Sequence, residues 1–233
     1  MSPVWLASGS VATALLVLLV WTMQRRGYFA LYPVLFLYIL VSLLASIAEW
    51  AIVLKFYSLS NEDYKFYYWT NEFVLQTFLF ILMLAFVFRA LEKLPHRLLW
   101  TIGVGLLVLA AVFGSILASG MSEPRKWLSL LSRNLSFASA LLNFLLWTAL
   151  IKNRGRDLQL LLLAAGVGLM ATGKAIGQSL RTIGPEAVTV GNVIIVGSQL
   201  LCLGIWLWAL RAIPARDRTG KLVSITSTRG ANA

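Results

Sequence analysis

Long apolar stretches alternate with short polar segments along the whole chain. Seven stretches reach the ~20 residues that an α-helix needs to cross a ~30 Å hydrocarbon core. They cover residues 4–23, 31–55, 68–91, 98–119, 126–150, 158–181 and 190–212. The pattern predicts an all-α, polytopic membrane protein with a seven-transmembrane-helix bundle over residues 1–213. A polar, basic tail over 214–233 is expected to be disordered.

The composition supports this class and gives an orientation. Hydrophobic residues make up 59% of the 233 residues and charged residues only 12%, whereas soluble domains carry about 25% charged residues. Thirteen of the 20 lysines and arginines fall on one side of the predicted membrane and five on the other. The positive-inside rule therefore predicts an outside N-terminus and a cytoplasmic C-terminus. The net charge of +11 then indicates anionic lipid at the cytoplasmic rim, and nothing indicates nucleic acid as a partner.

Ionisable residues interrupt four of the predicted helices in the half nearer the outer surface. They are Glu49, Glu72, Arg133 and Lys174. A charge in the hydrocarbon core costs about 2.5–3.5 kcal/mol on insertion scales, so these side chains are expected to face the bundle interior and to pair. Their similar depth favours Glu72 with Arg133 and Glu49 with Lys174.

Polar and aromatic residues continue the same helical faces at spacings of three and four. Trp69 and Gln76 share a stripe with Glu72, Gln178 lies one turn after Lys174, and Tyr68 stands beside Trp69. The predicted site therefore comprises Glu49, Glu72, Arg133, Lys174, Gln76, Gln178, Trp69 and Tyr68. Because the inner halves of these helices are apolar, the pattern predicts an outward-facing cavity with a sealed floor. Alternatively, the ion pairs only hold the helices together.

Two further features concern packing. The helices predicted over 4–23 and 98–119 carry no charge within their spans and are expected at the periphery. Gly173 and Gly177 form a GxxxG pattern, which favours close approach of another helix.

Motifs for catalysis or cofactor binding are absent from the sequence. The only histidine is His96, whereas a zinc site needs three or four N, S or O ligands. No GxSxG elbow occurs, which leaves Ser136 as the least implausible nucleophile. Microbial rhodopsins carry their retinal lysine on the seventh helix, where this chain has none. We expect no metal, no cofactor and a protein that is not an enzyme.

The segment Tyr67-Tyr68-Trp69-x-x-Glu72 opens the third predicted helix. In a chain of this length and topology, it resembles bacterial seven-helix inner-membrane proteins. The resemblance implies the bacterial cytoplasmic membrane as the location, and it carries no activity over to this chain.

The function expected from these patterns is binding of a small polar or zwitterionic ligand or a lipid headgroup from the outside, as a sensor or accessory protein. Two alternatives remain. One is a structural or assembly subunit of a larger membrane complex, with a membrane-protein partner at the small residues Gly103, Gly105, Ala111 and Gly114. The other is a small transporter, although the apolar inner halves offer no evident cytoplasmic path.

Overall fold

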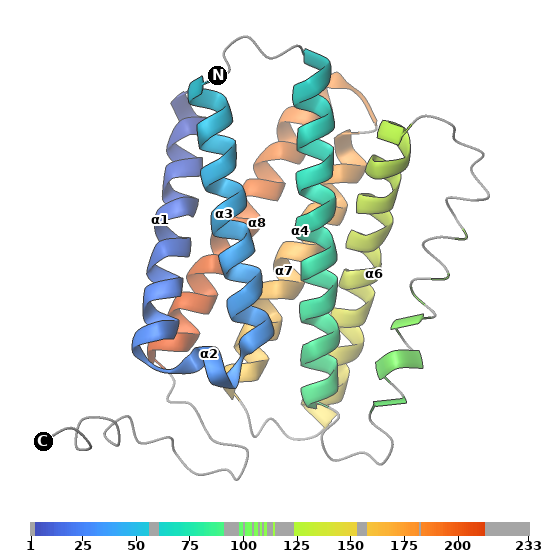
Figure 1. The fold of residues 1–233 in the computed structure, drawn as a ribbon. Coiled ribbons are helices and arrows are strands. Elements are labelled where there is room, and N and C mark those ends of the chain that lie inside the picture. The colour runs from blue at the N-terminus through green and yellow to red at the C-terminus, as the bar shows by residue number, and fades with distance from the viewer. Residues whose placement is uncertain are drawn as a thin grey trace, which may run out of the picture.

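The computed structural model describes residues 3–55, 61–90, 124–152, 158–181 and 183–212, and part of 98–114. Its helices are α1 (Pro3–Arg25), α2 (Tyr28–Leu31), α3 (Pro33–Lys55), α4 (Asn61–Ala90), α6 (Pro124–Lys152), α7 (Leu158–Arg181) and α8 (Pro185–Ala212). The long helices stand side by side in one bundle (Figure 1). The described residues of 98–114 are helical, but most of the predicted helix 98–119 and the whole tail 214–233 lie outside the described residues.

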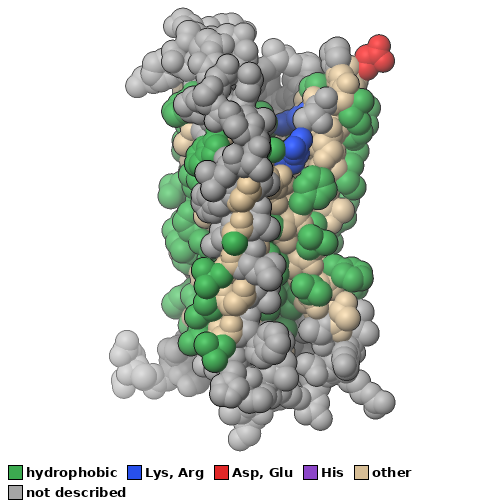
Figure 2. Space-filling model, turned by 90° about the vertical axis from the view of Figure 1, so that its right-hand side faces the viewer, with side chains coloured by type: hydrophobic (Ala, Val, Ile, Leu, Met, Phe, Trp, Pro, Cys, Tyr) green, Lys and Arg blue, Asp and Glu red, His purple; other side chains and the backbone are tan. Residues whose placement is uncertain are grey.

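Among the described residues, five helices are long and apolar enough to cross a membrane. The spans are Ala7–Arg25, Pro33–Ile52, Phe66–Ala90, Leu158–Arg181 and Glu186–Ala212. Large apolar side chains cover much of the outside of the bundle, as Figure 2 shows for one side. On α6, Leu141 and Phe144 are 67% and 71% exposed, as expected for a surface that lipid covers. The all-helical prediction is confirmed, and the five spans indicate a multi-pass membrane protein.

The long helices form a closed ring in which α7 is the most enclosed. Each packs against the next in the order α1, α3, α4, α6, α7 and α8, and α8 returns to α1. α7 also contacts α4 across the ring. Within α7, 67% of the apolar window is buried, against 22–33% in the other four candidate spans. Side chains on α7 are therefore well placed to meet several helices at once.

Glycines bring α7 close to α8. A Cβ on Gly177 would lie 2.6 Å from the carbonyl oxygen of Gly191, and a Cβ on Gly173 would overlap the Ser198 side chain. Because glycine has no Cβ, the two backbones can pack in direct contact at these positions, where any larger residue would clash. The close packing predicted from the GxxxG pattern is confirmed.

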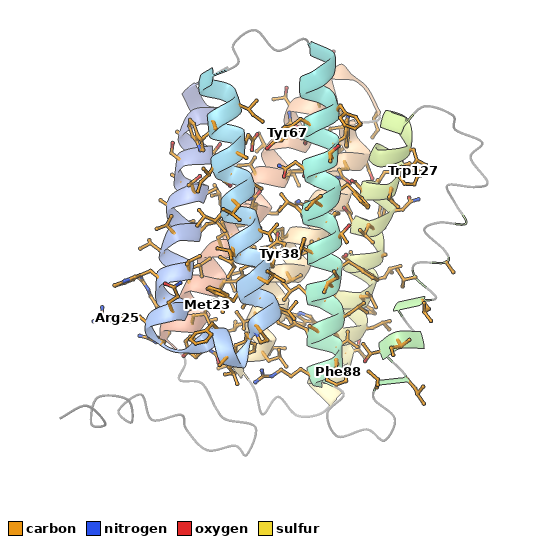
Figure 3. All side chains as sticks on the ribbon, viewed as in Figure 1. Met23, Arg25, Tyr38, Tyr67, Phe88 and Trp127 are labelled. Atoms are coloured by element: carbon orange, nitrogen blue, oxygen red, sulfur yellow. The ribbon has the colours of Figure 1, made fainter. Side chains whose placement is uncertain are left out.

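Apolar side chains make up most of the buried core of the bundle, and Figure 3 shows the described side chains between the helices. Trp206 of α8 is fully buried there, and its indole nitrogen donates to the Leu163 carbonyl oxygen of α7 at 3.0 Å. The Tyr38 ring of α3 meets Trp206 edge-on, with centroids 5.8 Å apart. These rings and the leucines around them seal the middle of the bundle.

Arginines fasten the helices at the end of the bundle away from the N-terminus. Arg26 donates from Nη1 to the carbonyl oxygens of Leu210 and Arg211 at 2.9 and 2.8 Å. These carbonyls belong to the last turn of α8, which has no helical donors for them. Arg89 of α4 donates to the Leu31 carbonyl oxygen at 2.8 Å. The Arg26 bonds connect the end of α1 to the end of α8, and the Arg89 bond connects α4 to α2.

Candidate functional site

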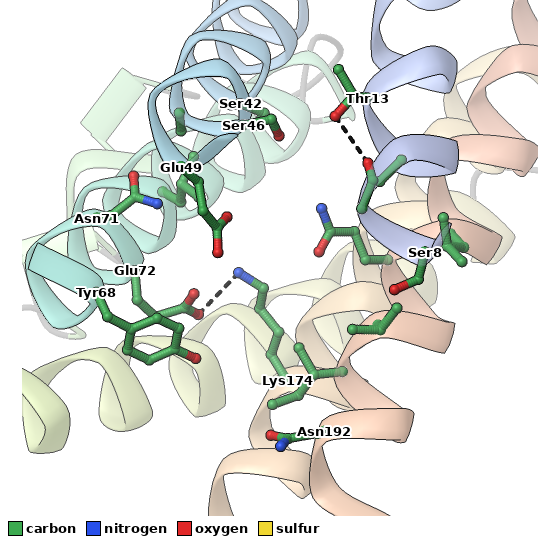
Figure 4. A pocket seen from close by; sticks show the side chains of 18 of the residues that line it. Ser8, Thr13, Ser42, Ser46, Glu49, Tyr68, Asn71, Glu72, Lys174 and Asn192 are labelled. Atoms are coloured by element: carbon green, nitrogen blue, oxygen red, sulfur yellow. Dashed lines mark hydrogen bonds and ion pairs between the residues drawn. The ribbon is translucent and has the colours of Figure 1, made fainter. Parts of the chain in front are cut away.

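A cavity of about 390 Å³ lies in the half of the bundle that contains the N-terminus. Five helices line it, namely α1, α3, α4, α7 and α8 (Figure 4). Its charged lining residues are Glu49 of α3, Glu72 of α4, and Lys174 and Arg181 of α7. The gathering of polar lining in one half, above a packed apolar half, is the arrangement that the sequence predicts.

An ion pair joins α4 to α7 in the cavity wall. Lys174 is only 4% exposed, and its Nζ lies 3.0 Å from Oε1 of Glu72. Gln178, one turn after Lys174, donates from Nε2 to the same carboxylate oxygen at 3.3 Å. A buried charge is tolerated when it is paired and hydrogen-bonded, and here both conditions are met.

Uncharged polar residues extend this wall toward α6. Gln76 donates from Nε2 to the Ser136 hydroxyl oxygen, and both side chains are fully buried. The Ser136 hydroxyl donates to the Ser132 carbonyl oxygen at 2.9 Å within α6 and lies 3.4 Å from Oε1 of Gln178. Hydrogen bonds therefore link α4, α6 and α7 behind the ion pair.

Arg181 lies nearer the end of the bundle, at the last residue of α7. Its Nε donates to the Asn192 side-chain oxygen at 2.6 Å, and its Nη1 donates to the Tyr68 hydroxyl at 2.7 Å. The Tyr68 ring in turn meets Trp69 edge-on, with centroids 5.3 Å apart. The guanidinium is thus positioned by two neutral groups.

Glu49 and Ser42, on α3, have no such partners. Glu49 is exposed and makes no ion pair with the described residues, and its carboxylate points toward the Lys174–Glu72 pair (Figure 4). Ser42 is 7% exposed, and its hydroxyl oxygen has no hydrogen-bond partner among the described residues. This wall of the cavity therefore carries hydrogen-bonding capacity that the described residues do not use.

The expected ion pairs differ from the observed one. Glu72 pairs with Lys174, not with Arg133, which leaves the prediction of a Glu49–Lys174 pair without support. Arg133 is half-buried on α6 and does not line the cavity. The physical reason is helical phase: Ser132 and Ser136 occupy the buried face of α6, and the next residue along a helix points about 100° away.

The first helix is closer to the polar residues than a peripheral helix would be. Ser8, Gly9, Ala12 and Thr13 of α1 all line the cavity. A Cβ on Gly9 would lie 3.5 Å from the Trp50 ring of α3, so the small residues make room at this wall. The expectation of a peripheral first helix was based on its lack of charge, and that criterion misses small polar residues.

Other predicted site residues divide between lining and support. Tyr68 lines the cavity. Trp69 and Gln178 do not line it but contact the lining residues Tyr68 and Glu72. Gln76 bonds to Ser136, and neither residue lines the cavity. The sequence prediction did not include Arg181 and Asn192. The spacing of Arg181 from Lys174, seven residues along one helical face, was the available signal.

Among the described residues, the metal-ligating residue types are scattered, and Ser136 bonds within its own helix. No group of three or more histidine, cysteine, aspartate or glutamate side chains there could hold a metal ion. His96 lies outside the described residues. The Ser136 hydroxyl donates to a carbonyl of its own helix, which is a common structural arrangement for serine in a membrane helix.

No protein-family model, curated protein or solved structure matches this chain. The geometry of the cavity is therefore the basis for a functional proposal.

Proposed function

We propose that this chain is a bacterial inner-membrane protein that binds a small polar or zwitterionic ligand from the outside, as a sensor or accessory protein. In this proposal seven helices cross the membrane, with residues 98–119 forming the one that lies mostly outside the described residues. The N-terminus is outside and the C-terminus is cytoplasmic, because the basic residues follow the positive-inside rule.

The observation that carries this proposal is the cavity itself. Its volume of about 390 Å³ is within the range of about 300–1,000 Å³ common for small-molecule sites. Ionisable residues inside a membrane protein mark functional sites by default. Here two of them, Glu49 and Arg181, lack an ion-pair partner among the described residues.

Transport is less favoured than binding. Below the cavity the interior is filled by Tyr38, Met170, Trp206 and buried leucines. The Tyr38 hydroxyl lies against the Met170 sulfur at 3.7 Å. A path to the other side would require these side chains to separate.

In the alternative of an assembly subunit, small residues of the predicted helix 98–119 contact a membrane-protein partner, and one of them is not available for this contact. Gly105 faces the bundle, because a Cβ there would lie 3.3 Å from Leu84 of α4. Gly103 and Gly114 have open space beside them, and Ala111 lies outside the described residues. A sensor would still need a partner, and the basic inner rim with Arg25 and Arg26 is where we place it, beside anionic lipid.

Native mass spectrometry of gently extracted protein tests the proposal. Ala45 lines the cavity, so Ala45→Trp would fill it, whereas Leu141→Trp adds the same ring on the exposed face of α6. We expect a small-molecule adduct on the wild type and on Leu141→Trp, and none on Ala45→Trp. Absence of any adduct, or an adduct that persists on folded Ala45→Trp, would contradict binding in this cavity.

A further inference from the structure

The charges that line the cavity do not all cancel one another. Glu72 and Lys174 form an ion pair at 3.0 Å. Among the described residues, Arg181 donates to the uncharged groups of Asn192 and Tyr68, and Glu49 has no ion-pair partner there. One carboxylate and one guanidinium therefore line the cavity without a counter-charge from the described residues.

These two groups stand on opposite walls and at different depths. Glu49 is on α3, and Arg181 is on α7, which is not a neighbour of α3 in the ring. Glu49 lies more than one turn inside the end of α3 at Lys55, whereas Arg181 is the last residue of α7. A ligand entering from this end would meet the guanidinium first and the carboxylate further in.

Both groups have unused binding capacity. A guanidinium has five N–H donors, and Arg181 uses two of them within the described residues. The remaining donors suit a carboxylate or phosphate, which guanidinium groups bind in bidentate fashion. The lining also includes the rings of Tyr67 and of Trp50, which follows Glu49 in the sequence, and aromatic faces attract ammonium groups.

We infer that the cavity binds a soluble zwitterion with its ammonium group at Glu49 and its carboxylate or phosphate at Arg181. This inference rests on the proposed function and names its ligand class. The Ser42 hydroxyl, buried in the same lining, adds a hydrogen-bonding group beside the ligand. A zwitterionic phospholipid fits less well, because its phosphate lies nearer the bilayer centre than its ammonium, which reverses the order of the two sites.

The experiment uses the full chain in nanodiscs of phosphatidylglycerol, which contain no zwitterionic lipid. Glycine, β-alanine and γ-aminobutyrate vary the separation of the two charges, while butylamine and butyrate each carry one charge. Isothermal titration calorimetry would give a Kd for each compound. We expect at least one zwitterion to bind at least tenfold more tightly than both single-charge compounds.

Single-charge variants then assign each end of the ligand. In Glu49→Gln the zwitterion should lose its advantage over butyrate, and in Arg181→Gln it should lose its advantage over butylamine. Glu186→Gln is the matched control for the acid, because Glu186 is exposed in the first turn of α8 and does not line the cavity. Arg25→Gln is the control for the base, at the other end of the bundle. Both controls should keep the wild-type Kd.

Three results would overturn the inference. The first is equal binding of zwitterions and single-charge compounds. The second is wild-type Kd values in both Glu49→Gln and Arg181→Gln. The third is a phosphatidylethanolamine molecule retained from nanodiscs of that lipid and lost in both variants, which would identify a lipid headgroup as the source.

The same variants separate this inference from the proposed function. An adduct that Ala45→Trp removes but both charge variants keep would leave the proposed function standing and refute the zwitterion. A wild type without any adduct or binding would refute both.

Discussion

The two long walls of the cavity differ in how many of their polar groups have hydrogen-bond or ion-pair partners. On the wall formed by α4 and α7, Glu72, Lys174 and Gln178 bond to one another. Behind them Gln76 donates to Ser136, while Oε1 of Gln76 has no hydrogen-bond partner among the described residues. On the wall formed by α3, Glu49 and Ser42 have no partners among the described residues. Polar groups that bond to each other hold helices together, whereas polar groups without partners are available to a ligand.

This difference separates residues that hold helices together from residues that are available to a ligand, and the sequence does not distinguish the two. Glu49 and Glu72 are both carboxylates in the outer halves of their predicted helices, and depth alone does not distinguish them. Their surroundings do, because Glu72 pairs with Lys174 of the enclosed helix α7, whereas Glu49 lines the cavity and makes no ion pair with the described residues. Substitutions on the two walls should therefore affect stability to different degrees.

The largest effect is expected from Lys174→Met. This substitution leaves Glu72 as a buried carboxylate without its cation, and breaking a buried pair in this way costs about 3–5 kcal/mol. Thermal unfolding in one detergent, followed by circular dichroism, would measure the loss. Because the neutral amide removes the unpaired charge, adding Glu72→Gln to Lys174→Met should restore most of the stability.

Arg133→Met is the matched comparison for that experiment. Arg133 has no ion pair among the described residues, so its loss should change stability by less than about 1 kcal/mol. If Arg133→Met were the more damaging change, or if Glu49→Gln rescued Lys174→Met in place of Glu72→Gln, the assignment of the pair would be wrong.

A smaller effect on stability is expected from glycine substitutions where α7 packs against α8. Gly177→Ala places a methyl group 2.6 Å from the Gly191 carbonyl oxygen, and overpacking of this kind costs about 1–3 kcal/mol. The Cβ that Gly197→Ala adds meets nothing within 4 Å. The higher helix propensity of alanine should therefore raise the free energy of unfolding by up to about 1 kcal/mol. Opposite shifts in unfolding temperature would support the close contact, and equal shifts would argue against it.

The smallest effect on stability is expected from Glu49→Gln. Glu49 is exposed to the cavity and makes no ion pair with described residues, so the change in unfolding free energy should stay within about 0.5 kcal/mol. The same thermal unfolding assay checks this value. A loss as large as that of Lys174→Met would place Glu49 in the structural network and remove the contrast between the walls.

Much of the fold could be predicted from the sequence, because hydrophobic length and helix geometry are local properties. The described helices α1, α3, α4, α6, α7 and α8 coincide with six of the predicted stretches to within a few residues, apart from earlier starts of α4 and α8. The close packing at Gly173 and Gly177 was also predictable, since only spacing and residue size were needed. Which helices adjoin was not, because that depends on contacts between residues far apart in sequence.

The candidate site could likewise be predicted only as far as local sequence properties allow. Depth in the membrane predicted that Glu49, Glu72 and Lys174 lie near one another, and all three line one cavity. That they bind a ligand stays a prediction. Depth could not indicate that Arg133 points away from it, because this depends on how α6 is rotated about its axis. Nor could it reveal Arg181 as a lining residue, because an arginine at a helix end is expected at any membrane interface.

The contact between α1 and α8 has a consequence for biosynthesis. α8 supplies one wall of the cavity, closes the ring against α1 and receives the Arg26 hydrogen bonds at its last turn. The ribosome delivers α8 after every other described helix, so until then α1 and α7 present an open groove to the lipid or to the insertion machinery. The cavity is therefore complete only when the final described helix has been inserted.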